Sequence, residues 1–267
     1  MIHATAVIHP KARLGAGVKV GAYAVVDEHV TLGDGCELGP HVYLTGWTKL
    51  GKNNRIHAGA VIGDVPQDLR YRGEETKVLI GDENVIREHV TIHRSNTVKE
   101  ATEIGSKNLL MAHCHVGHNS RIGNSVIIAN GTLIAGHVEI GDRVFISGNC
   151  VLHQFVRVGT LALMQGGAGI SKDLPPFTIA RENNGITGLN TIGLRRAGLS
   201  SEERLELRRL YHLLFRSGAK FRDALERAKR EARTEHAKIM VEFLESGKRG
   251  FCADRARGRA ESTEAAD

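Results

Sequence analysis

The sequence has 267 residues and a net charge of +6, and it combines 31 glycines with only 4% aromatic residues. This composition is unsuited to a large globular core but suits a thin coil of short strands and many turns. The positive charge is typical of a protein with an anionic partner, whether nucleic acid, a phosphorylated small molecule or an acidic protein. The sequence shows no signal segment, no apolar stretch near the roughly 18 residues of a membrane span, and no disulfide spacing among its four cysteines. We therefore expect a cytoplasmic protein without stable membrane insertion.

A six-residue repeat organises most of the chain. Every sixth residue from Ile2 to Ile62 is aliphatic, and the same phase returns from Ile80 to Ile92 and from Ile104 to Ile170. The residue two positions earlier is usually small or β-branched, and a glycine often follows the aliphatic residue, where a tight corner needs it. Each hexad is thus one short strand plus one turn, which predicts a parallel β-helix over residues 1–186 whose stacked coils bury a shared interior.

Two excursions interrupt the repeat, near residues 64–79 and 93–103. Long loops in a strict solenoid are usually functional or flexible. After residue 186 the pattern becomes helical: Ser200 and Glu203 form a capping box, and further helical stretches follow near 220–232 and 234–246. We expect a C-terminal helical domain over 187–246 and a polar, disordered tail over 247–267.

Histidines gather on one edge of the expected β-helix. If a coil is three hexads, residues 18 apart lie above one another at the strand spacing of about 4.8 Å. His118 then lies directly under Gly136, and the second excursion reaches the same edge one coil below. The same edge carries His115, His137, His153 and Gln154. Histidine suits acid–base chemistry near neutral pH, although a surface histidine is commonly just solvated.

A zinc site is the competing interpretation of these residues. His113, His115 and His118 with Cys114 offer nitrogen and sulfur ligands. Strand alternation counts against it, because neighbouring side chains point to opposite faces and Cys114 points inward.

Several longer segments resemble the UDP-N-acetylglucosamine O-acyltransferase family. They are Gly63–Tyr71 with its Gln-Asp-Leu-Arg-Tyr sequence, Ile86–Arg94, His115–Asn119 and Gly193–Arg196. The resemblance covers residues 1 to about 245. It implies a left-handed β-helix, a homotrimer, and no cofactor, metal or nucleic acid. It further implies transfer of a 3-hydroxyacyl group from acyl carrier protein to the 3-hydroxyl of UDP-N-acetylglucosamine, the first step of lipid A synthesis.

The resemblance also implies roles for individual residues. His118 matches the general base and Gly136 the donor of an oxyanion-binding N–H. The loop with Gln67, Asp68 and Arg70 reaches across a subunit boundary in similar enzymes, toward the sugar and the acyl chain. The other matched substrate-binding positions are His115, His137, His153, Gln154, Gly166, Asn190, Arg195 and Arg196. Among them, Asn190, Arg195 and Arg196 match nucleotide contacts, and the bare Gly166 predicts an open groove for a long acyl chain. The basic residues of the helical region match a docking face for acyl carrier protein.

Three positions depart from the family pattern. Asn119 stands where many members have an acidic residue after the catalytic histidine, Ile192 replaces an acidic residue near the nucleotide site, and Ala197 replaces an arginine. A 3-amino sugar nucleotide therefore stays open as an alternative acceptor. Some left-handed β-helices are zinc hydratases, and a non-catalytic scaffold on the same prism is the third possibility.

Overall fold

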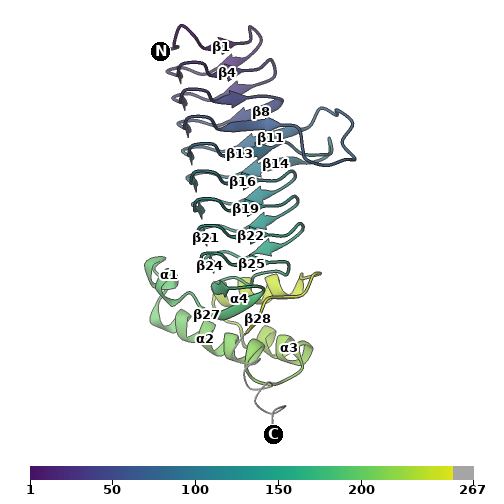
Figure 1. Cartoon of the computed structure of the whole chain (residues 1–267). Coiled ribbons are helices and arrows are strands. Elements are labelled where there is room, and N and C mark those ends of the chain that lie inside the picture. The colour runs from purple at the N-terminus through teal and green to yellow at the C-terminus, as the bar shows by residue number, and fades with distance from the viewer. Residues whose placement is uncertain (255–267) are drawn as a thin grey trace.

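The computed structural model describes residues 1–254, and within them the chain forms a tall three-sided prism of stacked coils with helices packed at its C-terminal end (Figure 1). Each side is one sheet whose strands are parallel through the stacked coils. The nine-stranded sheet contains β1 (Val7–Ile8), β4 (Val25–Val26), β7 (Tyr43–Leu44), β10 (Val61–Asp64), β13 (Thr91–His93), β16 (His115–Val116), β19 (Leu133–Ile134), β22 (Val151–Leu152) and β25 (Gly169–Ile170).

The eight-stranded sheet contains β2 (Arg13–Leu14), β5 (Thr31–Leu32), β8 (Trp47–Leu50), β11 (Lys77–Ile80), β14 (Ala101–Ile104), β17 (Arg121–Ile122), β20 (Glu139–Ile140) and β23 (Arg157–Val158). The eleven-stranded sheet contains β3 (Lys19–Val20), β6 (Glu37–Leu38), β9 (Arg55–Ile56), β12 (Val85–Ile86), β15 (Leu109–Leu110), β18 (Ile127–Ile128), β21 (Phe145–Ile146), β24 (Leu163–Met164), β26 (Thr178–Arg181), β27 (Gly185–Leu189) and β28 (Ala253–Asp254).

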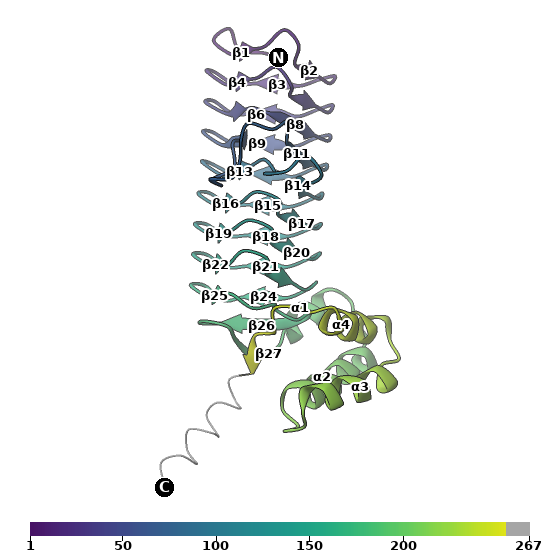
Figure 2. The ribbon, with the colours of Figure 1, turned by 90° about the vertical axis from the view of Figure 1, so that its right-hand side faces the viewer.

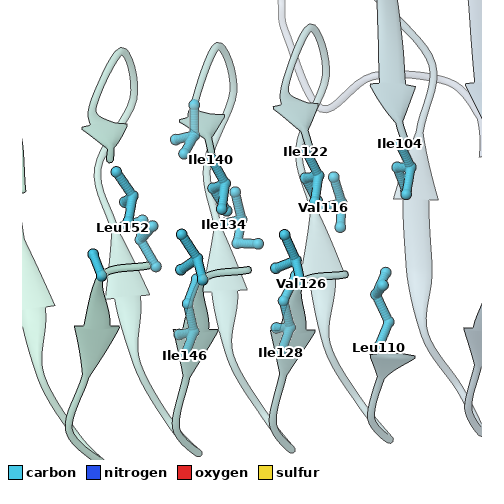
Figure 3. Close-up of a cluster of buried hydrophobic side chains, with 14 of the residues drawn as sticks. Ile104, Leu110, Val116, Ile122, Val126, Ile128, Ile134, Ile140, Ile146 and Leu152 are labelled. Atoms are coloured by element: carbon cyan, nitrogen blue, oxygen red, sulfur yellow. The ribbon is translucent and has the colours of Figure 1, made fainter. Parts of the chain in front are cut away.

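The hexad pattern explains the coil. Strand partners in regular coils are 18 residues apart, as in the pair His115 and Leu133, so three hexads make one turn. The predicted aliphatic row fills the interior, where Val116, Ile134 and Leu152 are fully buried (Figure 3). The parallel β-helix expected from the repeat is therefore confirmed, and neighbouring coils bury one continuous apolar column.

A ladder of buried asparagines holds the register where the excursions break the 18-residue spacing. The Oδ1 of Asn54 accepts the backbone N–H of Asn84, which lies 30 residues later, and the Oδ1 of Asn84 accepts that of Asn108 at 2.9 Å. The Nδ2 groups of Asn84 and Asn108 donate to the carbonyls of Gly105 and Gly123. Each buried amide thus has partners, as burial of a polar group requires.

Both excursions leave the same corner of the prism, between the nine-stranded and eight-stranded sheets (Figures 1 and 2). They are shorter than expected, because residues 77–79 already belong to β11 and residues 101–103 to β14. The first loop is therefore 65–76 and the second is 94–100. Arg94 anchors the first loop: its Nε donates to the hydroxyl of Tyr71, and its NH1 donates to the carbonyl of Gly63.

The C-terminal region begins after β27, with helices α1 (Thr191–Arg196), α2 (Ser201–Phe215), α3 (Phe221–Glu231) and α4 (Glu235–Glu245). The capping box of Ser200 and Glu203 is present at the start of α2. The disordered tail expected from residue 247 is wrong in its first part, because the chain returns as β28 beside β27 and buries Cys252 and Asp254. The carboxylate of Asp254 accepts a hydrogen bond from Tyr211 and forms an ion pair with Arg216, both in the helical region. The polar composition of the tail did not predict these contacts. The rest of the expected tail, residues 255–267, lies outside the described residues. Across residues 1–254, none of the helices combines the length and apolarity that crossing a membrane requires.

Candidate active site

The histidine corner is the edge formed by residues 117–120, 135–138 and 153–156, where the nine-stranded sheet passes into the eight-stranded sheet. His118 follows β16. Gly136 occupies the same position in the next coil toward the C-terminus, the direction we call above, as the 18-residue spacing predicts. His118 is 5% exposed, and its ring lies against the Cα of Gly136. A Cβ added at Gly136 would come within 2.7 Å of the His118 Nε2.

Gly136 is therefore needed for space rather than for backbone conformation. Its φ is not in the left-handed region, which at this corner belongs to His137 instead, at φ 58°. Any side chain at Gly136 would push the imidazole away, since real Cβ atoms do not approach other atoms this closely. Gly136 is buried, and among the described residues its N–H has no hydrogen-bond acceptor.

Asn119 fixes the tautomer of the His118 imidazole. Its Oδ1 accepts the backbone N–H of Asn96 at 3.0 Å, and this bond settles which end of the amide carries the oxygen. The same Oδ1 lies 2.9 Å from the His118 Nδ1. Since an amide oxygen only accepts, Nδ1 carries a proton, and in the neutral ring Nε2 then keeps its lone pair. In this tautomer the free nitrogen can take a proton.

Three further histidines surround His118. The ring of His137 stands edge-on to it at 5.2 Å between centroids, and His115 contacts His93 in the same way at 4.9 Å. Burial, together with smaller contributions from the neighbouring His93 and His118 rings, lowers the pKa of His115 to about 4. Burial also lowers the pKa of His93 and of His137. Burial at this corner therefore favours the neutral form of these three rings. The Nδ1 of His115 is hydrogen-bonded to the Thr91 hydroxyl, at 2.8 Å.

His93 was missed as a site residue by sequence reasoning. It is 8% exposed, and its buried Nδ1 has no hydrogen-bond partner among residues 1–254. The signal that could have found it is its place at the end of β13, one coil below His118 on the same side of the prism.

The first excursion folds against the histidine corner. Asp68 accepts Nδ2 of Asn96 at 2.6 Å and also pairs with Arg70, whose hydrogen bonds hold the pKa of Asp68 far below its usual range. Through Asn96 this carboxylate is linked to Asn119. The first loop is thus connected to Asn119 of its own chain through Asn96, and Gln67 is exposed at the loop surface.

His153 and Gln154 lie on the coil above Gly136. Gln154 is in the column of His118 and Gly136 and is half-buried, whereas His153 is exposed and its Nδ1 lies 3.2 Å from the Gln154 carbonyl. Phe155 completes the corner by stacking on His137 at 4.6 Å between ring centroids.

The remaining candidates lie elsewhere in the single chain. Gly166 is at the corner between the eleven-stranded and nine-stranded sheets, where a Cβ would have ordinary room, 3.6 Å from the Gly148 carbonyl oxygen. Asn190 caps α1: its Oδ1 accepts the N–H of Gly193, and its Nδ2 donates to the Leu161 carbonyl. Its side chain therefore already has structural partners. Arg195 and Arg196 are exposed in the last turn of α1. Arg196 lies beside the outer face of the eleven-stranded sheet, and Arg195 lies near Arg204 and Arg208 of α2.

The proposed zinc ligands do not converge. Cys114 points into the core, where burial raises the pKa of its thiol to about 11 and its Sγ lies 3.1 Å from the Ala129 carbonyl oxygen. In the part of the chain that the structure describes, no three His, Cys, Asp or Glu side chains are grouped so that they could hold a metal ion.

Comparisons with known proteins bear on this geometry. An acyl-[acyl-carrier-protein]–UDP-N-acetylglucosamine O-acyltransferase of Myxococcus xanthus is 42% identical over 94% of this chain and 98% of its own length. The chain belongs to the UDP-N-acetylglucosamine O-acyltransferase family. A second relative with the same name, from Syntrophobacter fumaroxidans, is also 42% identical, over 93% of this chain and 98% of its own.

Family models and solved structures agree with this assignment. The model of domain 2 of UDP-N-acetylglucosamine O-acyltransferase matches residues 173–252, and the bacterial transferase hexapeptide model matches 29–64 and 101–136. A UDP-N-acetylglucosamine acyltransferase from Bacteroides fragilis superimposes with a TM-score of 0.91 at 39% identity, covering 94% of this chain and 99% of that one. The enzyme from Francisella novicida gives 0.92 at 36% identity, with 95% and 94% covered. These matches fit the expected left-handed form of the β-helix with C-terminal helices.

For this member of the UDP-N-acetylglucosamine O-acyltransferase family, Gly136→Ala tests the packing of the site. The added methyl is expected to displace the His118 ring, because no space exists between the two residues. A crystal structure should show a rotated imidazole that has lost its bond to Asn119. Gly166→Ala is the matched control, because that corner accepts a Cβ without strain. An unmoved His118 ring in the Gly136→Ala protein would contradict the packing described here.

The low pKa of His115 makes stability depend on pH. The unfolded chain binds this proton near pH 6.5, whereas the folded chain binds it only near pH 4. Stability from His115 is therefore complete above about pH 6.5 and is lost as the pH falls toward 4. In denaturant titrations across this range, His115→Gln should lose less stability than the parent. Equal pH dependence of the two proteins would show that His115 titrates normally.

Proposed function

We propose that this protein transfers a 3-hydroxyacyl group from acyl carrier protein to the 3-hydroxyl of UDP-N-acetylglucosamine, the first step of lipid A synthesis. The observation that carries the proposal is the pairing of a free Nε2 on His118 with an unbonded N–H on Gly136 directly above it. One group accepts a proton and the other donates to a negative oxygen, which are the two functions that attack on a thioester requires.

The mechanism follows from that pairing. Nε2 of His118 takes the proton of the sugar 3-hydroxyl as its oxygen attacks the thioester carbonyl carbon, and the carbonyl oxygen becomes an oxyanion. The Gly136 N–H donates to this oxyanion, and a preorganised donor of this kind contributes a few kcal/mol. The tetrahedral intermediate then collapses, the C–S bond breaks, and the leaving thiolate receives the proton from the His118 imidazolium. Both catalytic groups return to their starting states.

The proposed substrate contacts come from the surrounding groups. Asp68 and Gln67 on the first excursion, with His115, His137, His153 and Gln154, line the approach to His118. Arg70 is bound to Asp68 and so holds that carboxylate in place. Neutral rings suit this task, because a neutral imidazole both donates and accepts a hydrogen bond.

The outer faces of the prism favour a homotrimer. The eight-stranded sheet carries charges that alternate in register on its outer face: Glu103, Arg121, Glu139 and Arg157, the last of which packs on Phe243 of α4. The eleven-stranded sheet carries an apolar outer row instead, formed by Val85, Leu109, Ile127, Phe145, Leu163 and Ile179. A continuous apolar row of this kind favours burial against another chain.

Association would also complete the site. The histidine corner lies opposite the eleven-stranded face, which carries Asn190, Arg195 and Arg196. A single chain therefore keeps the nucleotide-contact candidates apart from His118, and a neighbouring chain can supply them. With Gly166 leaving its corner open, the proposed acyl group is a long one. Exposed Arg208, Arg209 and Arg222 on α2 and α3 are the proposed contacts of the acidic acyl carrier protein, and the proposed location is the cytoplasm.

His118→Ala tests the function. Acyl transfer from 3-hydroxyacyl carrier protein to UDP-N-acetylglucosamine should fall by about 10²- to 10⁴-fold, the usual contribution of a positioned base, while thermal unfolding shows a folded protein. His9→Ala, which removes an exposed histidine from the first coil, is the matched control. Product formation is measured with acyl chains of several lengths.

Two results would overturn parts of this proposal. Undiminished turnover by His118→Ala would remove the imidazole from the mechanism. Faster turnover of the 3-amino analogue than of UDP-N-acetylglucosamine would reassign the acceptor atom.

A further inference from the structure

The histidine that accepts the proton has no charged neighbour of its own. The Nδ1 of His118 is bonded to the amide oxygen of Asn119, which carries no net charge. When His118 takes a proton it becomes a cation, and at 5% exposure water stabilises that cation poorly. A negative charge nearby would offset this cost.

Glu100 supplies that charge from the second excursion. Its Oε2 accepts the Asn119 Nδ2 at 2.7 Å, on the amide group whose oxygen faces His118. The same oxygen lies 3.9 Å from the Nδ1 of His137. The Asn119 amide therefore links the two groups: its oxygen is bonded to the His118 imidazole, and its nitrogen is bonded to the Glu100 carboxylate.

The Asn119 amide has little freedom to turn away. Its Oδ1 also accepts the N–H of Asn96, and its Nδ2 also donates to the Ser95 hydroxyl at 2.9 Å. Its backbone N–H donates to Thr102, and its φ of 59° lies in the left-handed region that asparagine tolerates. Hydrogen bonds in such a chain polarise one another, so the carboxylate strengthens the acceptor at His118.

We propose that Glu100 is a positioning residue for the acyl transfer, stabilising the His118 imidazolium through Asn119. The proposal rests on the proposed function and adds to it the source of the negative charge. No bond to Glu100 is made or broken: the proton moves from the sugar hydroxyl to Nε2 and then to the leaving thiolate.

Other titratable groups also lie near His118 and Asn119. Asp68 and Arg70 come from the first excursion and are paired with each other, so their charges largely cancel. Asp64 and Arg94 lie near His93. The other neighbours are three histidines whose pKa burial lowers: His93 on β13, His115 on β16, and His137 between β19 and β20. Glu100 is thus the acidic group bonded to Asn119, and within the described residues its one possible ion-pair partner is His137, whose pKa burial lowers.

Glu100→Gln separates charge from hydrogen bonding, because the Gln oxygen can still accept Nδ2 of Asn119. We expect kcat to fall severalfold and the acid limb of kcat/KM to move to lower pH by about half a unit, the scale of one partly exposed charge. The direction follows because a less stabilised imidazolium loses its proton at lower pH. KM for the sugar nucleotide should change little. Glu103→Gln is the matched control, since that carboxylate lies on the outer face of the eight-stranded sheet.

Asn119→Asp completes a double-mutant cycle. It places a carboxylate on Nδ1 of His118 and removes the donor that Glu100 accepts, so the two acids repel each other. In this background Glu100→Gln should leave kcat unchanged or raise it, whereas it lowers kcat beside Asn119. Such a reversal of sign would not arise from a merely structural role.

The outcomes distinguish this inference from the proposed function. An inactive parent chain with acyl carrier protein and UDP-N-acetylglucosamine would defeat the function itself. An active parent with identical pH profiles for Glu100→Gln and Glu103→Gln would defeat only the role of Glu100. So would an equal loss of kcat from Glu100→Gln in the parent and in the Asn119→Asp variant.

Discussion

The close packing of His118 against Gly136 is the contact on which the proposed chemistry depends. Parallel strands fix the distance between coils at about 4.8 Å, so residues 18 apart meet face to face. This spacing leaves room for an imidazole under a bare Cα but not under a side chain. The same strand stacking that buries the aliphatic core therefore sets the distance between the His118 ring and the Gly136 backbone.

Irregular structure completes what the repeat begins. The prism supplies His118, Gly136 and His137, but the groups that orient them come from the two excursions. Asn96 and Glu100 of the second loop bind the Asn119 amide, and Asp68 of the first loop binds Asn96. Because both loops leave the coil at the same corner, their polar groups reach the imidazole without disturbing the core. The repeat thus fixes the positions of His118 and Gly136, and the loops supply the carboxylates of Asp68 and Glu100.

Much of this fold follows from the sequence, because the six-residue period determines which residues stack. The column of His118 and Gly136 follows once the coil is taken, from the family resemblance, as three hexads. The short strand and turn of each hexad and the capping box at Ser200 depend on local spacing. The contacts of Glu100 and Asn96 do not, since no period governs a loop. Nor did spacing reveal the buried His93 or the return of the chain as β28, which depends on the pairing of Asp254 with Tyr211 and Arg216. The sequence also did not predict that Asn190 caps helix α1, because a motif match does not show which partners a side chain already has.

A crystal structure of the assembled protein with its acylated sugar nucleotide would test the central claim most directly. The account predicts that the 3-oxygen of the sugar lies within hydrogen-bond distance of Nε2 of His118, and that the acyl carbonyl oxygen lies within hydrogen-bond distance of the Gly136 N–H. An acyl ester bound away from the histidine corner, or one whose carbonyl oxygen points away from Gly136, would contradict it.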